Sequence, residues 1–180
     1  MILPGGLLRV FGLGVLIVGD SGVGKSECAL ELITRGHRFV SDDVTECTIE
    51  DGRLFGTSPE VSHHFMEIRG LGIINIKEIF GAKAVSSREE IRLVINLQRW
   101  EEGKTYDRMG LEFAQDRKIA DIPVPQITIP VGPGRNIATL IEVACKVYLL
   151  KKSGYHAPKE IIDRLDKALN DQRDKKRKFP

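Results

Sequence analysis

The sequence has few cysteines and almost no net charge, and both features narrow the classes of protein it can belong to. Its three cysteines, Cys28, Cys47 and Cys145, form no Cys-x-x-Cys pair, so we expect neither a zinc knuckle nor a disulfide framework. The 27 basic and 25 acidic residues leave a net charge of +2, far from the basic surplus of nucleic-acid-binding domains. We therefore predict a protein of the reducing cytoplasm that binds no nucleic acid.

Long hydrophobic runs are also missing. The first twenty residues are apolar, but Pro4, Gly5, Gly6 and Arg9 interrupt them, and no basic segment precedes them as in a signal peptide. No stretch reaches the roughly 18 apolar residues of a membrane span. With 42% hydrophobic and 29% charged residues, the composition is that of a globular protein. We predict one domain over residues 1–180 with no membrane segment, ending in a helix and basic tail at about 158–178.

Strand and helix patterns alternate along the chain, which predicts an α/β fold. Strands are expected at Val15–Val18, His37–Val40, Val44–Ile49, Arg53–Phe55, Ile91–Leu97 and Gln126–Val131, and helices at Ser26–Arg35, Ile137–Leu150 and from Pro158. The charged segment Gln98–Pro125 has little periodicity and is typical of a functional or mobile loop. The charged tail Asp171–Pro180 is expected to fray.

One glycine-rich segment carries the chemistry. It reads Gly19-Asp20-Ser21-Gly22-Val23-Gly24-Lys25-Ser26 and lies between a predicted strand and a predicted helix, as a phosphate-binding P-loop does. Its backbone N–H groups and the helix N-terminus suit phosphate oxygens, and Lys25 suits the β and γ phosphates. The Ser26 hydroxyl suits Mg²⁺. ATP with Mg²⁺ is the predicted cofactor, and a turn without a ligand is the alternative.

A pair of carboxylates follows the strand after the P-loop helix. Asp42 and Asp43 would lie beyond the carboxyl end of that strand, where α/β sheets bind their ligands. One could hold Mg²⁺ and the other accept a proton from an attacking hydroxyl. We favour Asp43 as the base, although the residues leave the assignment open. A solvated turn is the alternative. The guanine-specific Asn-Lys-x-Asp motif is missing, which weighs against a GTPase.

Several strings together resemble HPr kinase/phosphorylase, a family that phosphorylates a serine of the phosphocarrier HPr and can reverse the reaction. They run from Gly5 to Tyr148: Phe11 to Ile17 leading into the P-loop, Arg35-Gly36-His37-Arg38, Glu67-Ile68-Arg69-Gly70-Leu71-Gly72-Ile73-Ile74, Tyr106-Asp107-Arg108 and Pro130–Asn136. The string from Glu67 is the most specific. The resemblance implies a P-loop sheet with flanking helices, of the type found in HPr kinase and phosphoenolpyruvate carboxykinase.

The resemblance also implies roles and partners. It makes Lys25 and Arg108 catalytic, Ser26 and Glu67 ligands of Mg²⁺, and Asp43 the acid/base. HPr is the implied substrate, a homo-hexamer the implied assembly, and inorganic phosphate or pyrophosphate a participant in the reverse reaction.

Two positions depart from the family pattern. The family has a histidine where Pro4 stands, and its Pro-Val-Arg-Pro-Gly-Arg loop, implicated in dephosphorylation, has glycine here at Gly132. Losing a cation should hurt phosphorolysis most, because phosphate attack on phosphoserine brings two anions together. We therefore expect an enzyme biased toward the kinase direction. A phosphate-sensing ring with little turnover and a small-molecule P-loop kinase are the competing hypotheses.

Overall fold

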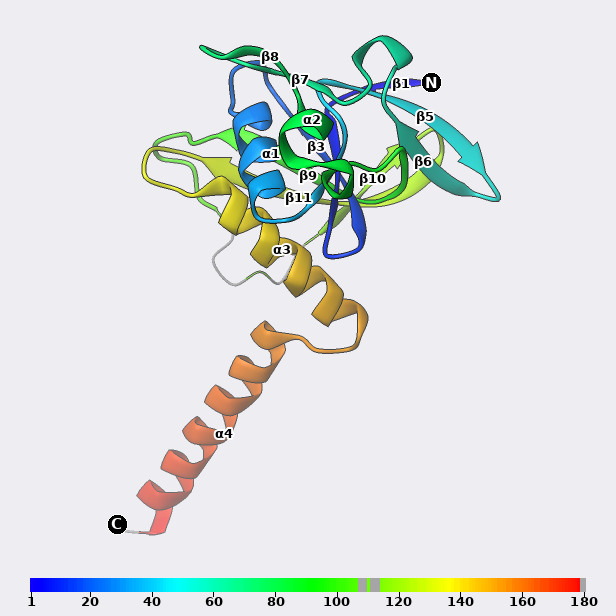
Figure 1. The fold of residues 1–180 in the computed structure, drawn as a ribbon. Coiled ribbons are helices and arrows are strands. Elements are labelled where there is room, and N and C mark those ends of the chain that lie inside the picture. Colours follow the sequence, from blue (N-terminus) through cyan, green and yellow to red (C-terminus); the bar gives the residue numbers. More distant parts are fainter. Residues whose placement is uncertain (107–109, 111–113, 179–180) are drawn as a thin grey trace.

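The computed structural model describes residues 1–106, 110 and 114–178, with side chains as far as residue 170. A mixed β-sheet forms its centre (Figure 1). Its strand order is β1-β5-β6-β9-β3-β2-β4, and β11 and β10 extend it beside β9. The strands of this sheet are β1 (Ile2–Pro4), β2 (Gly6–Val10), β3 (Leu13–Gly19), β4 (Arg38–Ser41), β5 (Val44–Glu50), β6 (Arg53–Thr57), β9 (Arg88–Arg99), β10 (Gln115–Ile119) and β11 (Ile122–Val131).

Four strands run in the same direction and end at the same edge. β9 pairs in parallel with β3 on one side and with β11 on the other. β2 is antiparallel to both β3 and β4, so β4 runs in the direction of β3. The ends of these strands, Gly19, Ser41, Arg99 and Val131, therefore face one edge of the sheet, and the loops that follow them are brought together there.

Two apolar clusters hold the sheet. Helices α1 (Lys25–Thr34) and α3 (Ile137–Lys152) cover one face, where buried side chains such as Leu32, Ile95 and Ile141 belong to one cluster. The second cluster includes Leu16, Val94 and Val124 and is enclosed where the sheet curls over itself. Every residue from Leu13 to Val18 is buried, so β3 is covered on both faces and reads as a continuous apolar run.

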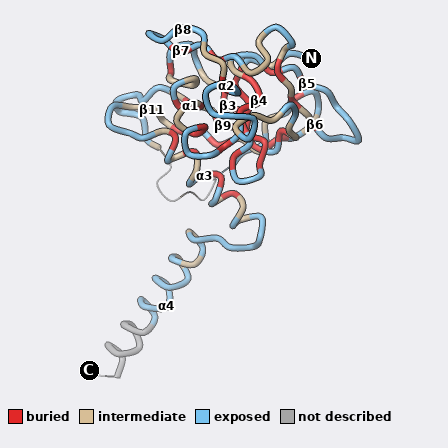
Figure 2. The backbone as a smooth tube through the Cα atoms, viewed as in Figure 1, coloured by how far each residue is buried: buried red, intermediate tan, exposed pale blue. Residues whose placement is uncertain are grey.

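Smaller elements surround this centre. The hairpin β7 (Phe65–Ile68) and β8 (Gly72–Asn75) forms a separate sheet, and helix α2 (Ile76–Phe80) follows it. Short 3₁₀ turns lie at Glu60–Ser62 and Ala82–Ala84. Helix α4 (Ala157–Lys178) projects away from the sheet (Figure 1), and Figure 2 shows its described part as largely exposed. No described helix combines the length and apolar character that crossing a bilayer requires.

The predicted elements are confirmed with shifts of a few residues, apart from two. The segment Gln98–Pro125 was expected to lack regular structure, yet it contains β10 and the start of β11, which pair across the turn at Ala120-Asp121. The tail was expected to fray from Asp171, but α4 continues to Lys178. The sheet is curled and mixed, because β1, β5 and β6 add antiparallel strands.

Candidate functional site

The glycine-rich loop (Gly19–Ser26) leaves β3 at the shared edge of the sheet and leads into α1. Gly19 has φ 149°, and a Cβ there would lie 2.5 Å from the carbonyl oxygen of Leu97, so only glycine fits beside β9. Gly24 has φ 96° and caps α1 in the left-handed region that favours glycine. Both glycines are therefore required by the path of the chain, independently of any ligand.

The loop exposes hydrogen-bond donors. In the described part of the chain, the backbone N–H groups of Ser21, Gly22 and Gly24 have no acceptor, whereas that of Val23 donates to the carbonyl of Asp20. The Lys25 ammonium donates to the carbonyls of Gly19 and Asp20 at 3.0 and 3.1 Å, which folds its side chain back over the loop. Unsatisfied amides beside a helix N-terminus and an ammonium are suited to bind phosphate oxygens.

Ser26 joins the loop to the aspartate pair. Its hydroxyl lies 3.1 and 3.2 Å from the two carboxylate oxygens of Asp42, the residue after β4. Burial, and then the neighbouring Asp43 carboxylate, raise the pKa of Asp42 to about 6, although hydrogen bonds from Ser26 and from the backbone of Glu67 oppose that rise. A carboxylate held this way is suited to receive a nearby cation, which would relieve the cost of its burial.

Asp43 is exposed and has the left-handed φ of 56°, which is uncommon for a residue other than glycine. Two backbone hydrogen bonds hold it there, from Gly5 N–H to the Asp43 carbonyl at 2.7 Å and from Val44 N–H to the Asp42 carbonyl at 2.6 Å. Pro4 pairs with Val44 in the β1–β5 register, so position 4 lies next to this turn. The position at which the resemblance leads us to expect a histidine is thus a neighbour of Asp43.

Glu67 and Arg69 reach the site from the β7–β8 hairpin. The backbone of Glu67 lies close enough to the Asp42 carboxylate to lower its pKa, which places this residue beside the aspartate pair. The Arg69 guanidinium lies 3.8 Å from the point that a Cβ on Gly22 would occupy. The structure therefore brings together Lys25, Ser26, Asp42, Asp43 and Glu67. Arg108, the remaining predicted catalytic residue, lies outside the described residues.

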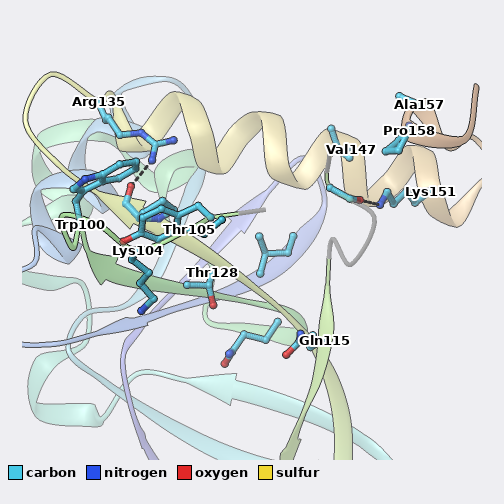
Figure 3. A pocket seen from close by; sticks show the side chains of 16 residues that line it. Trp100, Lys104, Thr105, Gln115, Thr128, Arg135, Val147, Lys151, Ala157 and Pro158 are labelled. Carbon is cyan, nitrogen blue, oxygen red and sulfur yellow. Dashed lines mark hydrogen bonds between the residues drawn. The ribbon is translucent and has the colours of Figure 1, made fainter. Parts of the chain in front are cut away.

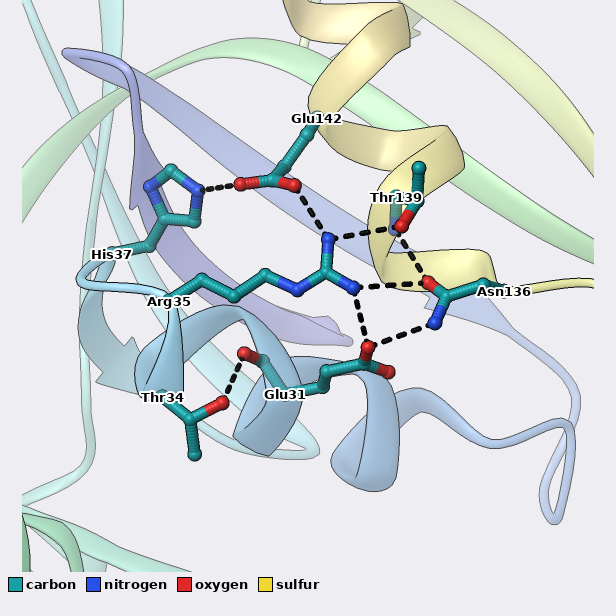
Figure 4. A network of polar contacts seen from close by, with 7 residues as sticks. All are labelled: Glu31, Thr34, Arg35, His37, Asn136, Thr139 and Glu142. Atoms are coloured by element: carbon teal, nitrogen blue, oxygen red, sulfur yellow. Dashed lines mark hydrogen bonds and ion pairs between the residues drawn. The ribbon is translucent and has the colours of Figure 1, made fainter.

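A polar network anchors the helix that follows the loop (Figure 4). Arg35, at the end of α1, donates to Glu142 of α3 at 2.6 Å, to Thr139 at 3.0 Å and to Glu31 at 2.5 Å. Asn136 caps α3 by accepting from Thr139 N–H and donates to Glu31 at 2.9 Å. These contacts fix α1 against the start of α3. They also hold the segment that leads from β11 into α3.

His37 completes this network. Its Nε2 lies 2.8 Å from the second oxygen of Glu142, and its ring is buried. Burial raises the pKa of Glu142, but the hydrogen bonds from His37 and Arg35 outweigh it and leave that pKa lowered. The hydrogen bond from Asn136 is the largest influence on Glu31 and lowers its pKa as well. Sequence reasoning had assigned the string Arg35–Arg38 no contacts, because its partners lie about a hundred positions away in the chain.

A cavity of about 1370 Å³ lies beside this site, between β11, the start of α4, α3 and the segment after β9. Figure 3 shows Arg135 and Trp100 at one end and Lys151 and Pro158 at the other. Arg135 stands 5.8 Å from the Trp100 ring, which stacks on Tyr106 at 4.5 Å. None of the residues of the glycine-rich loop lines this cavity. The cavity is therefore separate from the glycine-rich loop.

The donor set fits Mg²⁺ accompanied by phosphates better than a protein-only metal site. Among the described residues there is no group of three or more His, Cys, Asp or Glu side chains placed to hold a metal. Mg²⁺ usually takes one or two protein oxygens and completes its shell with phosphate and water. Ser26 with one carboxylate from Asp42, Asp43 or Glu67 meets that requirement.

The fold and site define an α/β protein in which a glycine-rich strand–loop–helix unit meets paired carboxylates at one edge of a curled mixed sheet. Comparison with known proteins narrows this class. The sequence model of the HPr serine kinase C-terminal domain matches residues 1–165, and the chain belongs to that family.

Individual relatives agree. The chain is 52% identical over 168 residues to an HPr kinase/phosphorylase of Bacillus licheniformis and 51% identical over the same length to one of Bacillus subtilis. Each match covers 93% of this chain and 54% of the relative, so the chain spans about half the length of these proteins. The solved HPr(Ser) kinase/phosphatase from Coxiella burnetii superposes with a TM-score of 0.80 at 37% identity, covering 86% of this chain and 94% of that one.

Proposed function

We propose that this chain transfers the terminal phosphoryl group of ATP to a serine of HPr and catalyses the reverse phosphorolysis with inorganic phosphate. Membership of the HPr serine kinase family supports the substrate. The observation that carries the proposal is the Ser26–Asp42 hydrogen bond, because it joins a loop with unsatisfied amides to a carboxylate pair at one sheet edge. We infer a P-loop fold of the type shared by HPr kinase and phosphoenolpyruvate carboxykinase.

Each residue has a task that its position permits. The amides of Ser21, Gly22 and Gly24 and the ammonium of Lys25 bind and orient the polyphosphate, after Lys25 exchanges its loop carbonyls for phosphate oxygens. Asp43 accepts the proton of the attacking serine hydroxyl, since its exposed carboxylate is free to meet a protein substrate. Ser26 would hold Mg²⁺ together with one carboxylate, from Asp42 or Glu67. Arg108 is assigned to charge stabilisation by family resemblance.

Bound Mg²⁺ would neutralise charge on the β and γ oxygens during transfer. The Ser26 hydroxyl can serve it without losing Asp42, because a hydroxyl has one proton to donate and two lone pairs to offer. The proposed arrangement therefore uses the hydrogen bond already present and needs no rearrangement of α1.

A labelled-transfer assay tests the proposal. The chain is incubated with γ-labelled ATP, Mg²⁺ and HPr, and in parallel with an HPr variant whose acceptor serine is alanine. Label on wild-type HPr alone is the expected result. Tight nucleotide binding without transfer would instead favour a phosphate-sensing ring, and label on a metabolite alone would favour a small-molecule kinase. Repeating the assay with pyrophosphate as donor defines the range of substrates.

We further infer a single catalytic domain over residues 1–180, with about 158–178 forming a helical arm, acting in the cytoplasm as a homo-hexamer. The exposed apolar side chains of Phe65, Leu71 and Ile73 on the β7–β8 hairpin support an assembly, because solvent-exposed apolar patches of this kind mark protein contacts. Light scattering coupled to gel filtration measures the mass directly. A monomer at micromolar concentration would refute the hexamer.

A further inference from the structure

Arg99 ends β9 at the shared sheet edge, one strand away from the loop that departs from the family pattern. It pairs in parallel with Val131, the last residue of β11. The N–H of Trp100 donates to the Val131 carbonyl at 2.7 Å, so the chain after Arg99 runs directly beside Gly132. Residues 99 and 132 are therefore neighbours in space.

The Arg99 guanidinium lies against the glycine-rich loop. Its Nη2 is 3.5 Å from the Ser21 carbonyl oxygen, a weak hydrogen bond, and 3.6 Å from the point that a Cβ on Gly22 would occupy. The side chain is exposed, and no described acidic residue forms a salt bridge with it. An arginine beside unsatisfied amides, with its charge unneutralised by the described residues, is poised to bind an anion.

Gly132 lies close against Trp100 and carries no side chain and no charge. A Cβ on Gly132 would lie 3.2 Å from Cβ and 3.5 Å from Cγ of Trp100, which is tighter than ordinary packing. Trp100 is itself held by stacking on Tyr106. Gly132 is not among the residues with positive φ, so its backbone does not require glycine, and a side chain there would press against Trp100.

We propose that Arg99 supplies the phosphate site with the positive charge that position 132 lacks, by contacting oxygens of the bound polyphosphate or of the attacking phosphate. The predicted effect of Arg99 on catalysis rests on the proposed function. The predicted effect of Arg99 on anion binding does not. Arg99 contacts the glycine-rich loop from β9, the strand that neighbours β3. Arg69, whose guanidinium also lies near Gly22, would bind the same anion from the β7–β8 hairpin.

The test separates charge from structure. Arg99→Gln removes the charge and keeps an N–H donor for the Ser21 carbonyl, Arg99→Lys keeps the charge, and Arg92→Gln makes the same charge change at an exposed position early in β9. Calorimetric binding of Mg²⁺-pyrophosphate is measured for all four chains. We expect Arg99→Gln to bind about tenfold more weakly, Arg99→Lys to stay within about threefold of the wild type and Arg92→Gln to be unchanged, as for loss of one charge-assisted contact.

Two outcomes would overturn the inference: binding by Arg99→Gln equal to that of the wild type, or no binding by any of the four chains. Unchanged binding would mean that Arg99 only steadies the Ser21 carbonyl. Circular dichroism and melting curves establish that each variant folds. Suppose that the wild type binds pyrophosphate and the variants show the expected order of affinities, while no label reaches HPr in the transfer assay. In that case the proposed function fails and this inference stands. Where transfer occurs, Arg99→Gln should lose more catalytic efficiency in phosphorolysis than in the kinase direction.

Discussion

The Ser26 hydroxyl oxygen lies within 3.2 Å of both carboxylate oxygens of Asp42, across 16 positions of sequence. This contact joins the first turn of α1 to the residue after β4. Ser26 and Asp42, which both offer oxygen atoms that suit Mg²⁺, are therefore oriented toward each other before any ligand binds.

Replacing Ser26 with alanine should weaken the response to Mg²⁺. The variant loses one metal ligand and leaves the partly buried Asp42 with one hydrogen bond fewer, so we expect kcat to fall roughly tenfold to a hundredfold and the Mg²⁺ concentration for half-maximal rate to rise. Titration of the initial rate with Mg²⁺ measures both effects. Ser21→Ala makes the same change in the same loop and should leave the Mg²⁺ response intact. An unchanged half-maximal concentration in Ser26→Ala would remove Ser26 from the metal site.

Asparagine at position 43 should abolish transfer and leave the fold intact. Asn tolerates the left-handed backbone that Asp43 adopts, so the substitution isolates the loss of the carboxylate. We expect kcat to fall by at least about a hundredfold, as for loss of a general base, with ATP affinity preserved. Asp51→Asn is the matched control, because Asp51 also has a positive φ, of 49°, in a turn remote from the loop. Full activity in Asp43→Asn would move the role of base to Asp42.

Breaking the network at the end of α1 should lower the melting temperature. Arg35→Met removes the hydrogen bonds to Glu142, Thr139 and Glu31 while preserving much of the side-chain length. We expect Tm to fall by a few degrees, and Arg38→Met, an exposed arginine of the same string, to change it little. Thermal unfolding followed by circular dichroism measures the difference. Equal melting temperatures for the two variants would show that the network contributes nothing to stability.

Glu142 should make stability depend on acid pH. Its pKa in the folded protein is below the ordinary value of 4.5, so the unfolded state binds more protons between the two values. The stabilisation is therefore fully present above about pH 4.5 and is lost as pH falls through the lowered pKa. Arg35 and His37 face this carboxylate from the end of α1 and the turn before β4. The Tm gap between wild type and Glu142→Gln should be constant near pH 7 and narrow in acid. A gap that does not change with pH would contradict this assignment.

The two directions of the reaction should differ in efficiency. The resemblance implies a histidine at position 4 and an arginine at position 132, and Arg99 would replace only the second of these groups. We therefore expect kcat/KM of the kinase reaction to exceed that of phosphorolysis. Pro4→His should raise phosphorolysis more than kinase activity, because position 4 adjoins the turn that holds Asp43. Comparable efficiencies in the wild type would refute the bias.

Local patterns predicted the parts of the site that are close in sequence, and missed those that depend on tertiary pairing. The strand–loop–helix unit and the place of Asp42 after β4 follow from glycine spacing and hydrophobic periodicity. The strands β1, β2, β7 and β8 and the short helix α2 were missed, because elements of three to five residues carry too short a pattern. No sequence pattern placed Arg99 at the glycine-rich loop. Its contact with Ser21 spans 78 positions and forms only when β9 pairs with β3.

The contacts that fix α1 against α3 can form only late in the synthesis of the chain. Arg35 and Glu142 are 107 positions apart, and at roughly 5–20 residues per second the ribosome adds the second on the order of ten seconds after the first. A nascent chain thus carries α1 without its lateral support until α3 has emerged. A nucleotide that meets the chain during translation would find the glycine-rich loop without the contacts of α3. The site is therefore complete only after α3 has been synthesised and has packed on α1.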